Sequence, residues 1–155
     1  MSLPTRVGRH GQAGTALVEF AILLPLVALI SFGAIDLGRA FRAVNEVRNA
    51  AREGAAHAQL NPSRLAGLGC TTPDTAQWHA RNEGGSGGTT LAIDVSTPGG
   101  TFSSADAGCA PLAPTASRGQ SITFTVSRPF NVLTPFVRAV TGNPTIRSSV
   151  TVRVQ

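Results

Sequence analysis

The 155-residue sequence contains no lysine, no tyrosine, one methionine, one tryptophan and only two cysteines. Two cysteines are too few for a disulfide-dense scaffold, and Cys70 and Cys109 lack the short paired spacing of a zinc site. Charged residues are scarce at 14%, while 42% of the residues are hydrophobic, which excludes a wholly disordered chain. Because only one stretch is long and apolar enough to cross a membrane, a polytopic transporter is excluded as well.

The absence of lysine affects how the positive charge is interpreted. All 13 basic residues are arginines, and with 8 acidic residues they give a formal net charge of +5. These arginines are spread along the chain without interleaved aromatic residues, whereas a groove that follows a nucleic-acid strand needs clustered charge and stacking rings. The sequence therefore argues against nucleic acid as a partner.

One apolar run dominates the first third of the chain. Residues 20–35 carry no charge, and extending the run back to Thr15 adds only Glu19 as an interruption. A helix over residues 15–35 would be about 32 Å long, enough to cross the hydrocarbon core of a bilayer. Residues 1–14 are polar and lack acidic side chains, and we interpret them as a short cytoplasmic leader.

The same helix is predicted to continue beyond the membrane over residues 36–60. Apolar residues recur there at helical spacing, at Leu37, Phe41, Val44, Val47, Ala51, Ala55 and Ala58. No small-residue cleavage site follows the apolar run, which argues against a secretory signal peptide. One helix is therefore expected from about Thr15 to Leu60, ended by Asn61-Pro62 because the residue before proline avoids helical geometry.

Other side chains of this helix indicate how it is stabilised and packed. The pairs Arg42 with Glu46 and Glu53 with His57 are spaced i, i+4 and are predicted to interact. Pro25 lies inside the span, where its missing N–H is expected to loosen or bend the helix. Neighbouring helices can absorb that defect in a membrane.

Glu19 needs a specific explanation. A carboxylate at the centre of a spanning helix costs about 2.5–3.5 kcal/mol, although Glu19 lies one turn after Thr15, where the helix dipole favours negative charge. In the simpler explanation it extends to the headgroup region. The alternative depends on Gly14, which precedes the apolar helix, with Glu19 at the fifth position beyond it.

This arrangement resembles the processing site of type IV prepilins and pseudopilins. Glu19-Phe20, Leu-Leu-Pro at 23–25, Asp-Leu-Gly-Arg at 36–39 and Ala-Ala-Arg-Glu-Gly-Ala at 50–55 resemble the TadE/TadF-like branch of the Tad (Flp) pilus system. The resemblance implies a pilin-like α+β fold and a minor pilin or pseudopilin that takes part in assembly of a Tad-type pilus. It implies a single-pass location with the C-terminal domain outside the cytoplasm, or incorporation into the pilus.

The resemblance also assigns roles to residues. A prepilin peptidase would cut after Gly14, leaving Thr15 as the first residue, with Glu19 and Phe20 as further recognition positions. A neighbouring subunit's Glu19 could then neutralise the new amino group in lipid. The expected helix-packing and assembly positions are Glu19, Pro25, Phe41 and Val44. Expected partners are the prepilin peptidase, other pilins or pseudopilins, Tad assembly-platform proteins and membrane lipid.

Residues 61–155 are predicted to form a loop-rich β domain. Three segments alternate, with inward rows at Leu91, Ile93 and Val95, at Ile122, Phe124 and Val126, and at Val150, Val152 and Val154. Such alternation is typical of an antiparallel sheet with one face on a core, and the amphipathic part of the long helix is the expected cover. A short helix is expected after Thr134-Pro135, ending near Gly142.

Two irregular stretches, 82–88 and 96–119, are expected to be loops. If the domain is exported, a Cys70–Cys109 disulfide would tether them and would contribute about 4 kcal/mol on a chain-entropy model. This makes the pairing of the two cysteines a prediction about compartment as well as about stability.

The polar residues of this part suggest no enzyme. Histidines and acidic residues are scattered without triad order or metal-ligand spacing, at His57, His79, Asp74, Asp94 and Asp106. Trp78 is expected to pack in the core or a loop, and the glycine-rich stretch 84–88 lacks the lysine of a phosphate loop. We therefore predict no catalytic residues, no metal and no cofactor.

Two other functions stay open. One is an uncleaved single-pass signal-anchor protein whose outer β-rich domain binds a ligand or partner. The other is a pilin-like DNA-uptake subunit, which would require salt-sensitive DNA binding. N-terminal sequencing separates the first from a processed pilin, because only processing makes Thr15 the first residue.

Overall fold

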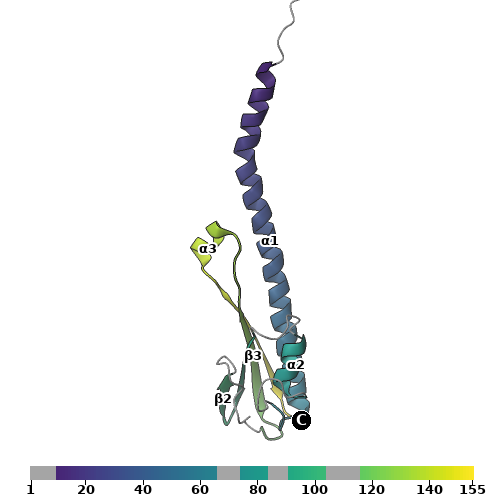
Figure 1. The fold of residues 1–155 in the computed structure, drawn as a ribbon. Coiled ribbons are helices and arrows are strands. Elements are labelled where there is room, and N and C mark those ends of the chain that lie inside the picture. The colour runs from purple at the N-terminus through teal and green to yellow at the C-terminus, as the bar shows by residue number, and fades with distance from the viewer. Residues whose placement is uncertain (1–9, 66–73, 84–90, 104–115) are drawn as a thin grey trace, which may run out of the picture.

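The computed structural model describes residues 10–65, 74–83, 91–103 and 116–155. The elements in chain order are α1 (His10–Leu60), α2 (Ala76–Glu83), β1 (Ala92–Thr97), β2 (Gly100–Ser103), β3 (Ser121–Pro129), α3 (Pro135–Thr141) and β4 (Thr145–Arg153). Figure 1 shows that the C-terminal part of α1 lies beside a small sheet, while its N-terminal part projects beyond the rest of the described chain. The predicted α+β fold is confirmed.

Helix α1 is continuous over 51 residues, about 77 Å at the usual helical rise. It begins at His10, so the predicted start near Thr15 was five residues too late. The prediction was wrong because it placed the start at the edge of the apolar run, whereas no proline lies between His10 and Thr15 to prevent the helix from starting earlier. Pro25 lies inside the helix without ending it, and the helix stops at Leu60 as predicted.

The sheet has four antiparallel strands in the order β2-β1-β3-β4. Strands β3 and β4 pair from Ser121 opposite Arg153 to Pro129 opposite Thr145, which makes them the longest hairpin of the sheet. The exposed face carries hydroxyl pairs across the strands, including Thr123 with Thr151 at 2.9 Å. One face of the sheet is thus polar, as the alternation predicts.

The opposite face of the sheet packs on the lower part of α1. The core residues are Val47, Ala50, Ala51, Ala55, Ala58, Leu65, Ala76, Ala80, Leu91, Ile93, Val95, Ala116, Ile122, Phe124, Val126 and Val154. The first two predicted inward rows are confirmed as buried, whereas Val150 and Val152 of the third row are partly buried against the core. The buried face of the helix consists mostly of alanine, which lets the sheet approach closely.

The sequence prediction missed two elements. Strand β2 lies inside the stretch 96–119, which was expected to be irregular, and forms a hairpin with β1. Helix α2 reaches Glu83 and so overlaps the start of the loop expected at 82–88. Cys70 and Cys109 lie outside the described residues, so their pairing stays a prediction.

Part of the predicted apolar face of α1 is not in the core. Val47 and the alanines after it are buried, Val44 is partly buried, and Leu37 and Phe41 are 73% and 69% exposed. The sheet ends below these two residues, so the globular part does not cover them. Their helical spacing marks a surface, but this surface is directed away from the protein's own core.

Candidate functional site

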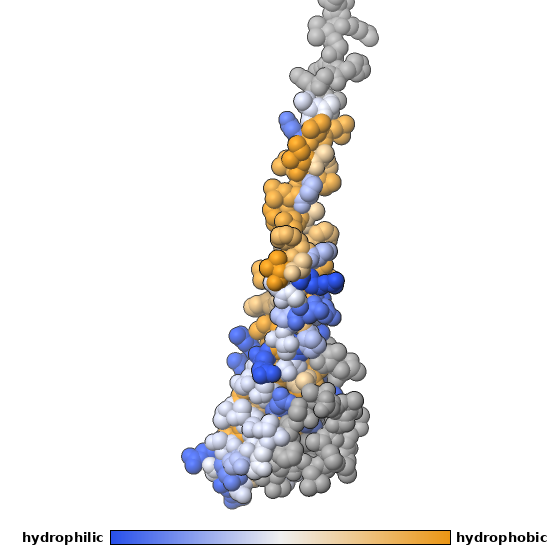
Figure 2. Space-filling model, turned by 90° about the vertical axis from the view of Figure 1, so that its left-hand side faces the viewer, coloured by the Kyte–Doolittle hydropathy of each residue, from blue (hydrophilic) through white to orange (hydrophobic). Residues whose placement is uncertain are grey.

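The N-terminal part of α1 has an exposed apolar surface on all sides. Within the described chain, no residue of its most apolar 18-residue window is buried. Figure 2 shows this apolar surface covering the upper part of α1 and giving way to hydrophilic surface lower down. By length and composition α1 can cross a membrane, and the exposure of this whole window argues against a helix buried in the core of a soluble domain.

The predicted processing positions lie at the start of this apolar surface. Gly14, Thr15 and Glu19 are exposed, and Phe20 is 62% exposed. A Cβ atom added at Gly14 would meet no atom within 4 Å, so close packing does not explain the glycine. Gly14 and Thr15 are both helical, and Glu19 lies one turn further along the same face as Thr15.

A second feature lies where the apolar surface ends. Residues 130–144, which connect β3 to β4 and include α3, form an arm that extends beside α1 toward its N-terminal part (Figure 1). Thr134 is the residue before the helix, Pro135 its first residue and Gly142 its C-terminal cap, as the sequence predicts. The Thr134 hydroxyl does not cap α3 but donates to Asp36 of α1, at 2.6 Å.

Asp36 holds the arm against α1. Its carboxylate accepts hydrogen bonds from the main-chain N–H groups of Leu133 and Thr134, at 3.1 Å and 2.8 Å, besides that from the Thr134 hydroxyl. Arg39 donates a further bond at 3.0 Å. Asp36 is buried at 7% exposure, and its burial is tolerated because these donors replace water.

The same bonds set the ionisation of Asp36. Hydrogen bonds from the side chain and then the main chain of Thr134, with weaker contributions from Leu133 and Arg39, lower the pKa of Asp36 from 3.8 to about 2. Burial acts in the opposite direction but is the smaller effect overall. The carboxylate is therefore ionised over the physiological pH range.

Arg39 contacts the arm at a second place. Its guanidinium donates to the carbonyl of Asn131 at 3.2 Å and lies over the ring of Phe130, 5.4 Å from the ring centre. An arginine can do both because its planar fork donates at the edge while its face stacks on an aromatic ring. Asp36 and Arg39, the first and last residues of Asp-Leu-Gly-Arg, thus fix the arm to α1.

Two cavities adjoin this contact between α1 and the arm. A cavity of about 300 Å³ is basic and is lined by Arg39, Arg42, Ala43, Glu46, Arg128, Pro129, Phe130 and Asn131. Glu46 pairs with Arg42 at 2.9 Å, as predicted from their spacing, and also with Arg128 at 2.6 Å. A second cavity, of about 230 Å³, is mostly apolar and is lined by Gly33, Asp36, Leu37, Ala40, Phe130, Val132 and Val137.

The comparisons with known proteins bear on this same helix. Residues 14–56 match the model of a family described as TadE-like protein. This segment of the chain is TadE-like. No curated protein and no solved structure matches the chain. This match supports an association with the Tad pilus, and the described part of the chain has one helix that is long and apolar enough to anchor it in a membrane.

The TadE-like segment includes every predicted processing and assembly residue from Gly14 to Val44. It also contains Asp36 and Arg39, whose function as a clamp the sequence analysis missed. Their motif was noticed only as part of a resemblance, because their partners lie more than ninety residues further along the chain. The sequence offered one signal for this clamp: the charged Asp36 directly after the spanning run, together with Thr134-Pro135 far downstream.

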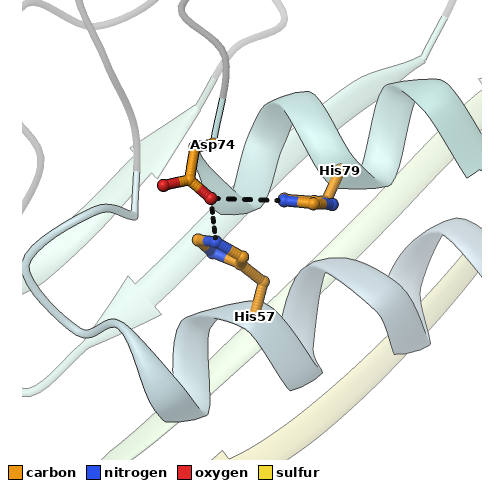
Figure 3. A group of neighbouring side chains, drawn as sticks. All are labelled: His57, Asp74 and His79. Carbon is orange, nitrogen blue, oxygen red and sulfur yellow. Dashed lines mark hydrogen bonds and ion pairs between the residues drawn. The ribbon is translucent and has the colours of Figure 1, made fainter.

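A third polar group lies just beyond the TadE-like segment. It consists of His57 of α1, Asp74, which precedes α2, and His79 of α2 (Figure 3). The nitrogen and oxygen atoms that these side chains could offer to a metal ion all lie within 4.8 Å of one another. One carboxylate oxygen of Asp74 lies 3.3 Å from His57 Nε2 and 3.7 Å from His79 Nε2. The expected pair of His57 with Glu53 is therefore replaced by a long-range contact.

The geometry of this group favours an ion-pair cluster. The two imidazole rings are stacked, with centres 4.4 Å apart and planes at 26°, and the Nε2 atoms of both face the same carboxylate oxygen of Asp74. Arg64 pairs with the other carboxylate oxygen of Asp74. The hydrogen bond from His57 and the charge of Arg64 lower the pKa of Asp74.

The Asp36 clamp yields a first prediction. In an Asp36→Ala variant the amides of Leu133 and Thr134 lose their acceptor, and we expect their hydrogen exchange to accelerate by about tenfold or more. Exchange measured by mass spectrometry on the full chain in detergent tests this. Glu53→Ala, an exposed acidic residue on the same helix, is the control. Unchanged protection of the arm in Asp36→Ala would contradict the clamp.

The clamp should also respond to pH in one direction. Because folding lowers the pKa of Asp36, its stabilising effect is complete above the unfolded value near 4 and is lost as the pH falls toward 2. Protection of the arm should therefore stay constant from neutral pH to about pH 4, once exchange is corrected for its intrinsic pH dependence.

Proposed function

We propose that the protein is a minor pilin or pseudopilin that takes part in assembly of a Tad-type pilus and is cut by a prepilin peptidase between Gly14 and Thr15. The observation that carries the proposal is the coincidence of the TadE-like match with the exposed apolar helix. The match begins at Gly14, where the apolar surface also begins. In this proposal the chain is the substrate of the peptidase and carries no chemistry of its own.

Cleavage would create a functional group that the uncut chain lacks. It would leave an α-amino group at Thr15, at the end of a helix that lies in lipid, where a charge needs a partner. Glu19 lies one turn away on an exposed face, so a Glu19 carboxylate of a neighbouring subunit can reach this position. The pairing would orient one helix relative to the next.

The exposed apolar residues beyond the span fit a role in assembly. Phe41 and Leu37 project from α1 above the sheet and make no part of the protein's own core. Exposed apolar residues of this size mark a contact with another protein or with lipid. Together with Pro25 and Val44, they supply a surface on which neighbouring pilin helices could pack.

Helical structure around Gly14 adds a requirement to the cleavage step. The carbonyl of a residue in a helix is hydrogen-bonded and shielded by the surrounding turn. Because α1 extends from His10, the peptidase must first unwind the turn that contains Gly14 and Thr15. A terminal helical turn opens at low cost, since ends of helices are the least stable parts of a structure.

N-terminal sequencing of the protein extracted from its native membrane tests the proposal. Processing predicts Thr15 as the first residue, with the prepilin peptidase, other pilins and Tad assembly-platform proteins as partners. A chain that begins at Met1 or Ser2 would overturn processing and would favour the uncleaved signal anchor with an extracytoplasmic binding domain.

The role of Glu19 gives a separate prediction. We expect Glu19→Ala to leave the protein in the membrane fraction, because the change makes the span more apolar. The amount of the variant recovered in sheared pili should fall by about tenfold, since one buried charge pair is lost from each contact between subunits. Quantitative immunoblots of membrane and pilus fractions would measure both, with Glu53→Ala as the control on the same helix. Normal recovery of Glu19→Ala in pili would contradict the pairing.

A further inference from the structure

We propose that the two cavities between α1 and the arm form a binding site for one anionic phospholipid. The basic cavity would hold the phosphate, and the apolar cavity would hold the upper part of an acyl chain. The inference rests on membrane insertion of α1 in the proposed function, but it does not depend on cleavage at Gly14.

The order of the two cavities along α1 matches the order of groups in a phospholipid. The apolar cavity includes Gly33 and Leu37 and therefore lies toward the spanning part of the helix. The basic cavity includes Arg42 and Glu46 and lies on the side away from the span. Phe130 lines both cavities, so they adjoin. A phospholipid with its headgroup in the basic cavity and its acyl chain in the apolar cavity would have the same orientation as the lipids of the surrounding bilayer.

The distance of the basic cavity from the end of the membrane span also fits the position of the lipid headgroups. Arg42 lies six residues after Asp36, about 9 Å along the helix, and the headgroup layer is about 5–8 Å thick on each side of the hydrocarbon core. Side chains on a helix tilt toward its N-terminus, which here is the membrane side. Arg39 and Arg42 therefore lean toward the phosphates and can extend further by snorkelling.

The charge of the basic cavity selects an anion. Three arginines and one glutamate line it, and Asp36 pairs with one of these arginines, Arg39, which leaves a formal net charge of one positive. Glu46 bridges Arg42 and Arg128 and keeps both side chains at the cavity. Arg42 is 79% exposed in this pair, so its remaining N–H donors face outward. Arginine is suited to phosphate because its fork donates two parallel bonds.

The free side of the arm supports lipid as the surrounding medium. Leu133, Phe136 and Val140 are 61%, 68% and 76% exposed, and Val137 of the same helix lines the apolar cavity together with Gly33 of the span. Phe136 and Val140 share one face of α3, while Arg138 lies roughly opposite. Such a short amphipathic element is suited to the boundary between headgroups and acyl chains. It is unsuited to the hydrocarbon centre, because its irregular backbone needs polar partners.

Lipid binding can be measured on the full chain in mild detergent by native mass spectrometry. We expect phosphatidylglycerol to bind about tenfold more tightly than phosphatidylcholine with the same chains, since the net positive charge of the basic cavity faces the phosphate. Arg42→Gln should weaken phosphatidylglycerol binding about fivefold. Arg52→Gln, which changes another exposed arginine ten residues further along α1, should leave it unchanged. Equal affinity for both lipids would overturn the proposal, as would competition by glycerol phosphate at the same concentration.

The position of the arm is tested separately. In a Phe136→Trp variant made in a Trp78→Phe background, the tryptophan fluorescence should be quenched by lipids that are brominated near the top of the acyl chains. Phe32→Trp in the same background reports on insertion of α1. Quenching of both residues supports the proposal. Quenching at position 32 alone overturns the lipid site and leaves the proposed function standing. Quenching of neither overturns membrane insertion, and the proposed function with it.

Discussion

Gly14→Leu should leave the protein with its full leader, so that its mass exceeds that of the processed wild type by residues 1–14. A peptidase that cuts after glycine must bring the scissile carbonyl close to its catalytic groups, and glycine is the residue that allows the closest backbone approach. We expect processing to be abolished, because a branched side chain at this position blocks that approach. Intact-mass measurement of protein expressed with its native prepilin peptidase gives the answer directly.

Gly33→Ala is the matched control for this experiment. A Cβ atom meets no atom within 4 Å at Gly14 or at Gly33, so a side chain at either position starts in open space. Any difference in processing must therefore come from recognition by the peptidase. If Gly14→Leu were cut as efficiently as Gly33→Ala, the Gly14–Thr15 bond would not be the processing site.

Local pattern was sufficient to predict the parts of this fold that have strong periodicity. The long helix, its end at Leu60 and the inward rows of β1 and β3 all follow from apolar residues at regular spacing. Helix α2 has only two turns and buries small or polar side chains, among them Gln77 and Ala80, so it carries no apolar period. Its available signal was Thr75, whose hydroxyl accepts from the N–H of Trp78 as an N-cap does.

The polar contacts were harder to predict because they join distant parts of the chain. Arg42 and Glu46 are neighbours on one helix, and their pair was predicted from spacing alone. Arg128 reaches the same carboxylate from a strand, and no local rule connects residues that are 82 positions apart. Sequence spacing therefore finds interactions within an element, whereas the clamp and the basic cavity depend on how the β3–β4 hairpin lies on α1.

That placement depends on small residues in the lower part of α1. Where the helix meets the sheet, its buried positions after Val47 are alanines and Gly54 rather than the larger residues found above. Phe124 of β3 is fully buried, and its ring lies directly over Gly54. The hairpin can approach α1 this closely only because no side chain intervenes, and the arm at its far end reaches Asp36 as a consequence.

Gly54→Ala should therefore destabilise the protein, although alanine is the better helix former. Its Cβ would lie 2.3 Å from Cε1 and 2.5 Å from Cζ of Phe124, closer than atoms can approach without displacing the ring. Overpacking of this kind costs about 1–3 kcal/mol, which outweighs the gain of about 0.5–1 kcal/mol from helix propensity. We expect the thermal unfolding midpoint to fall by about 2–8 °C.

The same substitution at Gly38 should change stability in the opposite direction, which makes the test specific. Gly38 lies on the same helix, and an added Cβ atom there meets no atom within 4 Å, so Gly38→Ala should raise the midpoint slightly. Combining Gly54→Ala with Phe124→Leu should cost less than the two single changes together, because the smaller side chain relieves the clash. If Gly54→Ala were as stable as Gly38→Ala, or if the double variant were simply additive, Phe124 would not pack on Gly54. The approach of the hairpin to α1 would then need another cause.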